Sequence, residues 1–315
     1  MKWLKKLFST TDKKGQSLKT EINLNKSSGS DNEQSKKIDT DVIQTETDPE
    51  KQYAFGIMYH QGSNLPQDYV QAAKWFLKSS EQGYFKAQND LASLYEKGLG
   101  VKKDLHKAFN WRKKAAEQHD PLCELNLGIY YEQGIGVKKD IHEAIKWYQK
   151  SAEGGNAEAQ FNLGNILYQG MEGIKVDYDM AFKWIEKSAK QDNAASLSLL
   201  GQMYANGQGV KQNTEKALEI MKSAVSKGSD SAAYLLGSWY KDGYFSIAIN
   251  IKTALKWWVI AADLGHPKAQ FNIGVSYYNG QDGFKKNNKK AIQWFKKAAN
   301  NGHPRSIEFL SQIGK

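Results

Sequence analysis

The sequence predicts an all-α protein, specifically a right-handed α-solenoid of seven helix-turn-helix repeats. Glycine recurs seven times at intervals of 36 or 37 residues. An alanine follows each glycine after 10 or 11 residues, and in six copies a tryptophan comes three residues after that alanine. Six copies also carry a tyrosine three residues before the glycine. Four columns in register over seven copies predict units that stack in series. The repeated glycines are Gly62, Gly98, Gly134, Gly170, Gly207, Gly243 and Gly280.

Each repeat is expected to contain two helices, named A and B, as the third copy (residues 121–156) illustrates. Apolar residues up to Tyr131 indicate helix A, and Gly134 stands just past its end, where a left-handed residue is least costly as glycine. Gly136 allows a second tight bend. Asp140 then begins helix B as its N-cap, with Glu143 placed to complete a capping box. The corresponding caps are Asp68, Asp104, Asp140, Asp177, Asn213, Asn250 and Asn287.

Small residues predict that the two helices of a hairpin approach closely. Gly128 in helix A and Ala144 in helix B leave room for the backbones, while Trp147 and Tyr131 fill the spaces on either side. A single hairpin cannot bury both of its faces, but seven hairpins in series can.

The chain divides into a tail and a repeat array. Residues 1–48 are rich in polar and charged side chains, so we expect a disordered tail. Residues 49–315 form the solenoid, with seven repeats over about 49–303. Pro304 begins a solitary helix A at 304–313, which we interpret as a cap on the last repeat; an edge for dimerisation is the alternative.

The first eight residues, MKWLKKLF, place four apolar side chains on one helical face and lysines on the other. One interpretation is a weak anchor on an anionic membrane, and the other is a frayed basic terminus without a partner. The lysines interrupt any secretory signal, and no apolar stretch is long enough to span a bilayer. We therefore expect a cytoplasmic protein, with the inner face of the membrane as a further location. The candidate membrane contacts are Trp3, Leu4, Leu7 and Phe8.

The columns, read together as A-x-x-x-L-G-x-x-Y-x-x-G-x-G-V-x-x-D-x-x-K-A-x-x-W-x-x-K-A-A, resemble the Sel-one-like repeat (SLR) family, which is related to tetratricopeptide repeats. The third copy, with LGIYYEQGIGVKKDIHEAIKWYQKSA, is among the best matches. Single departures are Ala92, Leu167 and Ile220, and copies six and seven have unusual loops, GYFSIAIN and GQDGFKKN. The resemblance implies an adaptor, as many bacterial members are. A β-lactam-binding branch of the family depends on paired cysteines, and this chain has only Cys123.

No pattern in the sequence predicts catalysis, a cofactor or a metal site. Repeat-equivalent histidines, His106 with His142 and His266 with His303, would lie about 10 Å apart on neighbouring units, too far for one tetrahedral ion. The single cysteine is expected to be an inert core residue. No nucleophile elbow, phosphate loop or zinc-protease motif is present. We therefore predict that the protein is not an enzyme.

The net charge of +10 points to a basic surface. Most lysines fall where helix B faces solvent, which indicates a solvated helical surface rather than a phosphate track. We expect no nucleic acid partner and a modest preference for acidic ones.

By analogy with tetratricopeptide-type stacks, helix A should line the concave face, and this face is the predicted binding groove for a protein or peptide. The alternative function is a peripheral membrane organiser tethered by the N-terminus, and the chain is expected to be a monomer or a weak homodimer. Asn126, Asn162 and Asn272 are interpreted as braces to the next helix. The candidate groove residues are Tyr53, His60, Asn89, Leu125, Ile129, Phe161, Asn165, Tyr168, Gln202, Tyr234, Lys241, Phe271 and Tyr278.

Overall fold

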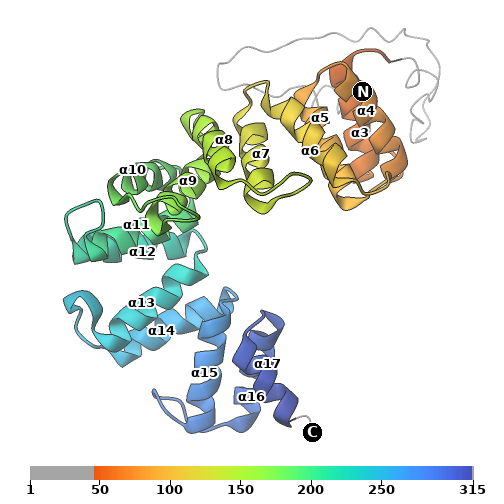
Figure 1. The fold of residues 1–315 in the computed structure, drawn as a ribbon. Helices are drawn as coiled ribbons and strands as arrows, with labels where there is room; N and C mark the ends of the chain where they lie inside the picture. The colour runs from red at the N-terminus through yellow and green to blue at the C-terminus, as the bar shows by residue number, and fades with distance from the viewer. Residues whose placement is uncertain (1–45, 314–315) are drawn as a thin grey trace, which may run out of the picture. The chain divides into compact units, whose positions relative to one another are not determined.

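A computed structural model describes residues 46–313, and within that range the chain is helical, without any β-strand (Figure 1). Seven hairpins follow one another along the chain, and α17 (Pro304–Ile313) comes last. This confirms the predicted all-α solenoid of seven repeats with a final helix. The predicted disordered tail and the membrane candidates Trp3, Leu4, Leu7 and Phe8 lie outside the described residues.

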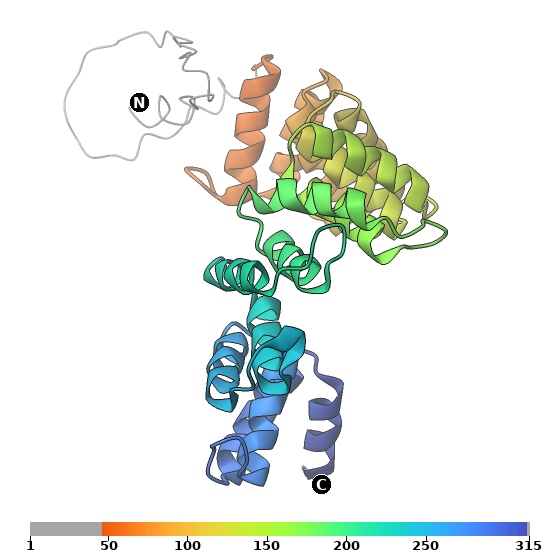
Figure 2. The ribbon, with the colours of Figure 1, turned by 90° about the vertical axis from the view of Figure 1, so that its left-hand side faces the viewer.

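In both ribbon views, each hairpin lies beside the hairpin that follows it in sequence (Figures 1 and 2). The pairs of helices A and B are α3 (Pro49–Gln61) and α4 (Tyr69–Glu81), α5 (Phe85–Lys97) and α6 (Leu105–Ala116), α7 (Pro121–Gln133) and α8 (Ile141–Glu153), α9 (Ala157–Gln169) and α10 (Tyr178–Ala189), α11 (Ala194–Asn206) and α12 (Thr214–Ser226), α13 (Asp230–Asp242) and α14 (Ile251–Asp263), and α15 (Pro267–Asn279) and α16 (Asn288–Asn300).

The helix boundaries are set by the residues that the repeat pattern predicts. The seven recurring glycines all have φ between 66° and 72°, which L side chains adopt only with strain. The seven Asp and Asn caps of helix B each accept a backbone hydrogen bond from the first turn. The capping box predicted at Asp140 is only half formed, because the Asp140 backbone N–H donates to the Tyr131 carbonyl at 2.9 Å and Glu143 pairs with Lys146.

Close packing of helix A on helix B depends on a glycine opposite a large side chain. A Cβ atom added to Gly128 would lie 2.6 Å from the Tyr148 ring, and one added to Gly237 would lie 2.2 Å from the Trp258 ring. Tyr148 is completely buried as a result. The residue that follows the tryptophan column, and not only the tryptophan itself, therefore fills the hairpin core.

The second loop glycine connects neighbouring repeats. A Cβ atom at Gly136 would lie 1.9 Å from the backbone oxygen of Leu105, at the start of helix B in the preceding repeat. Gly100 and Gly209 make the same approach to Tyr69 and Tyr178. The glycine is thus required by contact between repeats as well as by the bend for which the sequence predicts it.

The unusual loop of the sixth repeat forms a 3-10 turn, η1 (Tyr244–Ser246). Phe245 has a φ of 57°, and its ring packs edge-on against Trp239 at 4.9 Å. The backbone oxygen of Phe245 accepts a hydrogen bond from Thr214 at the start of α12. An aromatic side chain and one hydrogen bond therefore replace the glycine contact in this loop.

Candidate functional site

The candidate groove is the exposed side of the A helices, called here the A-helix face. Most of its predicted residues are half-buried, and only Lys241 and Tyr278 are exposed. Leu125 is a correction: it is 2% exposed and belongs to the core, because its side chain packs against helix B rather than toward solvent. Ile129 and Phe161 are half-buried against the same core layers.

Three predicted aromatic residues of this face are held by the next repeat. Tyr53 donates a hydrogen bond to Asp90 at 2.9 Å, and burial, followed by the charge of Asp90, raises the pKa of this tyrosine. Tyr234 and Phe271 stack on the histidines that cap the following helices, His266 before α15 and His303 before α17, each with ring centroids 4.4 Å apart. These rings therefore join consecutive repeats while one edge remains at the surface.

The other predicted residues make mostly local contacts. Tyr168 donates to Gln208 in the loop of the next repeat at 2.9 Å, whereas Asn165 and Gln202 bond within their own helices. His60 packs against Tyr69, and Lys241 lies over the Trp258 ring at 5.3 Å. Of the predicted groove residues, only Asn89 belongs to a polar cluster that joins several helices.

That centre lies between α5 and α7 and is built around Arg112, which reaches it from α6. The Arg112 guanidinium donates to Asn89 Oδ1 and to Ser93 Oγ, the latter at 2.8 Å. Its Nη2 lies 3.8 Å from the Glu96 carboxylate, and its charge faces the Tyr130 ring at 5.3 Å. Arg112 is 7% exposed, and its Nε is buried without a hydrogen-bond partner among the described residues.

Neighbouring side chains complete the centre. Tyr130 donates to Glu96 at 2.6 Å, and Asn126 donates to Asn89 at 3.0 Å, as expected of a brace between A helices. Burial and the hydrogen bond to Glu96 raise the pKa of Tyr130 to about 12, although Arg112 opposes the shift. The hydroxyl therefore remains a donor at neutral pH.

Two residues of this region are not among the sequence predictions. Arg112 occupies a column in which the other repeats have a large apolar residue, and this break in the column is the signal that identifies it. Leu122 on α7 is 53% exposed, in a column that is otherwise mostly polar or charged. The apolar members of the Arg112 column are Phe76, Tyr148, Ile185, Met221, Trp258 and Phe295.

Two of the histidines considered as metal ligands are helix caps. His266 Nδ1 accepts a hydrogen bond from the Ala269 backbone at 3.2 Å, and His303 Nδ1 accepts from the Ser306 backbone at 3.3 Å. Within residues 46–313, no group of three or more His, Cys, Asp or Glu side chains is arranged to hold a metal ion. These two histidines thus cap helices through the backbone.

These caps predict an acid-dependent loss of stability. Burial lowers the pKa of both His266 and His303, so the unfolded chain binds protons first, near pH 6.5. The stabilisation that the two neutral caps give the folded chain is therefore complete above about pH 6.5. It is lost as the pH falls through the folded-state pKa, because a protonated ring cannot accept the cap hydrogen bond. Chemical unfolding at about pH 7.5 and about pH 5 should show a smaller acid loss for His266→Asn/His303→Asn than for the wild type. Equal losses would contradict this role.

Cys123 is 2% exposed, and burial, together with the nearby Asp120 carboxylate, raises the pKa of its thiol. The group therefore remains a thiol at neutral pH and is shielded from solvent.

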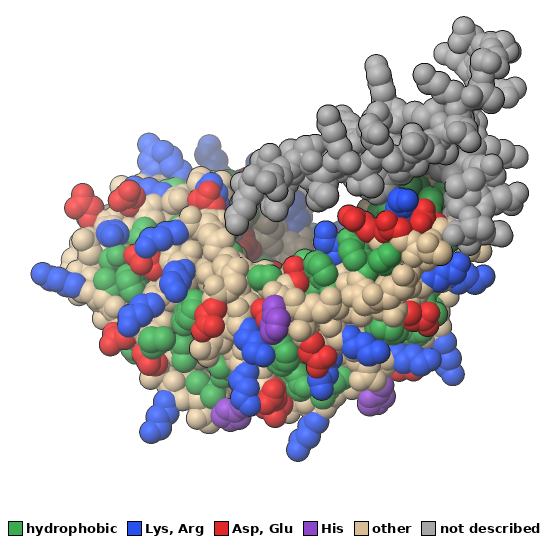
Figure 3. Space-filling view, turned by 90° about the horizontal axis from the view of Figure 1, so that it is seen from above, with side chains coloured by type: hydrophobic (Ala, Val, Ile, Leu, Met, Phe, Trp, Pro, Cys, Tyr) green, Lys and Arg blue, Asp and Glu red, His purple; other side chains and the backbone are tan. Residues whose placement is uncertain are grey.

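None of the helices between residues 46 and 313 is both long and apolar enough to span a membrane. On the face seen in Figure 3, basic side chains are interspersed with acidic ones.

The fold and the A-helix face define an α-solenoid of helix-turn-helix repeats. A family model described as Sel1 repeat matches residues 52–84, 85–120, 121–156, 157–193, 194–229, 230–266 and 267–303. The chain therefore belongs to the Sel1 repeat family. Proteins of this family are generally protein-interaction scaffolds.

Two solved structures show the relationship. The crystal structure of c5321, a protective antigen of uropathogenic Escherichia coli strains with an SLR fold, aligns with a TM-score of 0.66 and 30% identity over 84% of this chain. This chain covers only 56% of that antigen. A Sel1 repeat protein from Oxalobacter formigenes aligns with a TM-score of 0.70 and 27% identity, covering 85% of this chain and 76% of the other. A comparison with curated proteins gave no match.

Proposed function

We propose that this chain is a non-catalytic scaffold whose A-helix face binds an extended peptide or protein segment. The observation that carries the proposal is the Arg112 centre. A buried guanidinium loses hydration that its ion pair only partly offsets, so an apolar residue would suit folding better at this position. The guanidinium instead bridges α5 and α7, and it thereby fixes the relative positions of the exposed side chains that these two A helices present for recognition.

The surroundings of the centre suit an extended segment. Leu122 and Ile129 on α7 provide apolar area, and Asn126 provides an amide beside the guanidinium. Apolar contacts contribute binding area, while amides pair with the backbone of an extended segment. Farther along the array, Tyr278 is 44% exposed and offers an aromatic contact.

The proposal is tested by selecting peptides of about twelve residues from a random library on the immobilised full chain. The selected peptides are then titrated with Leu122→Ser/Tyr278→Ser, whose side chains are exposed and whose replacement costs little stability. We expect binding to weaken by about tenfold, which corresponds to about 1.4 kcal/mol.

The matched control is Val70→Ser/Met180→Ser, which removes two comparably exposed apolar side chains from helices α4 and α10. Its affinity should stay within about twofold of the wild type. If both double variants weaken peptide binding equally, the A-helix face is not the binding site. The same conclusion follows if the peptides bind Leu122→Ser/Tyr278→Ser as tightly as they bind the wild type.

A further inference from the structure

The outer face of the B helices has a repeated lysine–tryptophan design, from which the fifth and sixth repeats depart. In five repeats, a lysine one turn after the column tryptophan lies over its ring, at distances of 4.0 to 4.4 Å. Such a lysine covers the apolar ring and keeps its charge in water. The pairs are Trp75 with Lys78, Trp111 with Lys114, Trp147 with Lys150, Trp184 with Lys187, and Trp294 with Lys297.

The sixth repeat replaces this polar cover with aliphatic side chains. Ile260 stands where the lysine would lie over Trp257, and it is 37% exposed. Val259 beside it and Leu264 after the end of α14 are 36% and 45% exposed. In the other repeats, most residues at these three positions are polar or charged. We call these three residues the apolar patch.

The seventh repeat concentrates positive charge. Residues 283–303 contain six lysines and no acidic residue, and all six lysines are exposed. None of them forms an ion pair within the part of the chain that the structure describes, whereas other repeats pair lysines with Glu143, Glu186 or Asp192. The basic surface, as we call it, consists of Lys285, Lys286, Lys289, Lys290, Lys296 and Lys297.

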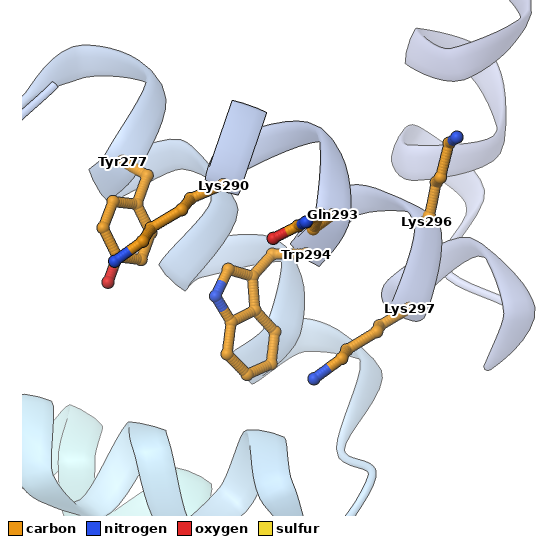
Figure 4. A pocket seen from close by; sticks show the side chains of 6 residues that line it. All are labelled: Tyr277, Lys290, Gln293, Trp294, Lys296 and Lys297. Atoms are coloured by element: carbon orange, nitrogen blue, oxygen red, sulfur yellow. The ribbon is translucent and has the colours of Figure 1, made fainter. Parts of the chain in front are cut away.

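A shallow depression of about 460 Å³ lies in the basic surface (Figure 4). Trp294 and Lys297 project to the same side of α16, and Lys290 lies over the Tyr277 ring at 5.3 Å. The corresponding depression of the third repeat, about 330 Å³, is lined by two lysines and two glutamates around Trp147. The shape is therefore shared between repeats, but the uncompensated charge belongs to the seventh.

The apolar patch belongs to α14, the B helix of the repeat that precedes the depression. Trp294 packs against the core layer that contains Ala261 and Ala262 of α14, and these two alanines directly follow Ile260. The helix that carries the apolar patch thus contacts the tryptophan of the depression through its buried side, and the two features belong to consecutive B helices. A surface with both properties is complementary to a segment that carries carboxylates beside apolar side chains.

We propose that the outer face of repeats six and seven is a second docking surface, which binds an acidic protein segment with apolar anchors. Carboxylates of the segment pair with Lys290 and Lys297, and an apolar side chain covers Ile260 and its neighbours. A nucleic acid would use the lysines but has no aliphatic groups to match the patch. An anionic bilayer would be attracted by the lysines, and the vesicles in the test below distinguish it from an acidic segment.

The test measures binding of three fluorescent peptides of about sixteen residues to the full chain. One peptide combines glutamates with leucine and phenylalanine at helical spacing, the second has serine in place of the apolar residues, and the third has glutamine in place of glutamate. We expect the first to bind and the other two to bind at least about tenfold more weakly.

Variants then locate the site. Lys290→Glu/Lys297→Glu should weaken binding of the first peptide by at least about tenfold, and Ile260→Lys, which restores the design of the other repeats, by about threefold or more. The matched control, Lys150→Glu/Lys187→Glu, reverses two charges and removes two lysine–aromatic contacts elsewhere on the outer face. It should change affinity by about twofold at most.

Each of the remaining outcomes would overturn the proposal. Equal weakening by the control would show unspecific attraction, and an unchanged affinity of Ile260→Lys would exclude the apolar patch. No binding of the first peptide at about 1 mM would exclude the surface. Tighter binding of single-stranded DNA, or of vesicles with about 30% phosphatidylserine, that is lost in Lys290→Glu/Lys297→Glu would assign the surface to those partners instead. The A-helix variant Leu122→Ser/Tyr278→Ser should bind the first peptide normally, so this proposal and the proposed function can fail separately.

Discussion

Replacing Gly136 with alanine is expected to lower the free energy of unfolding by about 3 kcal/mol or more. The φ of 66° at this residue costs an alanine about 1–2 kcal/mol, and the added Cβ would lie 1.9 Å from the Leu105 backbone oxygen. That oxygen belongs to the start of α6, so the collision cannot be relieved by a side-chain rotation and must separate two repeats. Urea unfolding followed by circular dichroism measures the loss.

Gly155→Ala is the matched control for this prediction. Gly155 also has a positive φ, of 92°, but a Cβ atom there would meet nothing within 4 Å. Its replacement should cost only the backbone strain, about 1 kcal/mol. A similar loss for the two variants would show that contact between repeats contributes nothing to the effect of Gly136→Ala.

The second large effect is expected at the Arg112 centre. Asn89→Leu should destabilise the chain by about 3 kcal/mol, because the buried guanidinium loses an acceptor and already has an unpaired Nε. Arg112→Met alone restores the apolar column and should change the stability by about 1 kcal/mol at most. The double variant Asn89→Leu/Arg112→Met should recover most of the loss, which a double-mutant cycle measures as coupling of about 2 kcal/mol.

Asn165→Leu serves as the control for that cycle. Asn165 lies half-buried on the same face, and its side-chain hydrogen bond is an exposed one with Gln169. Its replacement should change the stability by about 0.5 kcal/mol at most. If the losses of Asn89→Leu and Arg112→Met are simply additive, the two side chains do not depend on each other and the centre is not a network.

The repeats could be predicted from sequence because their signals are local and recur seven times. A glycine such as Gly134 past the end of helix A and a cap such as Asp140 before helix B each act within one turn. The close approach of Gly136 to Leu105 could not be predicted, since it depends on how one repeat lies on the previous one. The capping box at Glu143 was wrong because the Asp140 N–H, which it would pair with, donates across the loop to the Tyr131 carbonyl.

The candidate site was harder to predict, because repeat register gives a position but not the direction of a side chain. Leu125 occupies the same repeat position as Asn89 and Phe161, which are half-buried, yet it is 2% exposed and belongs to the core. The importance of Arg112 arises from contacts with α5 and α7, which no single helix reveals. The sequence signal that does identify such a residue is a single departure from a repeated column, as Arg112 departs from a column of large apolar side chains.

The close glycine approach occurs at some junctions and not at others, which has a mechanical consequence. Gly100, Gly136 and Gly209 lock the second, third and fifth repeats onto their predecessors, whereas Gly173 in the fourth repeat meets nothing within 4 Å. We therefore expect the array to flex unevenly, with stiff blocks separated by softer hinges at the entries to the fourth and seventh repeats. Such hinges would let the spacing between distant contact points adjust to a ligand while every hairpin keeps its own helices intact.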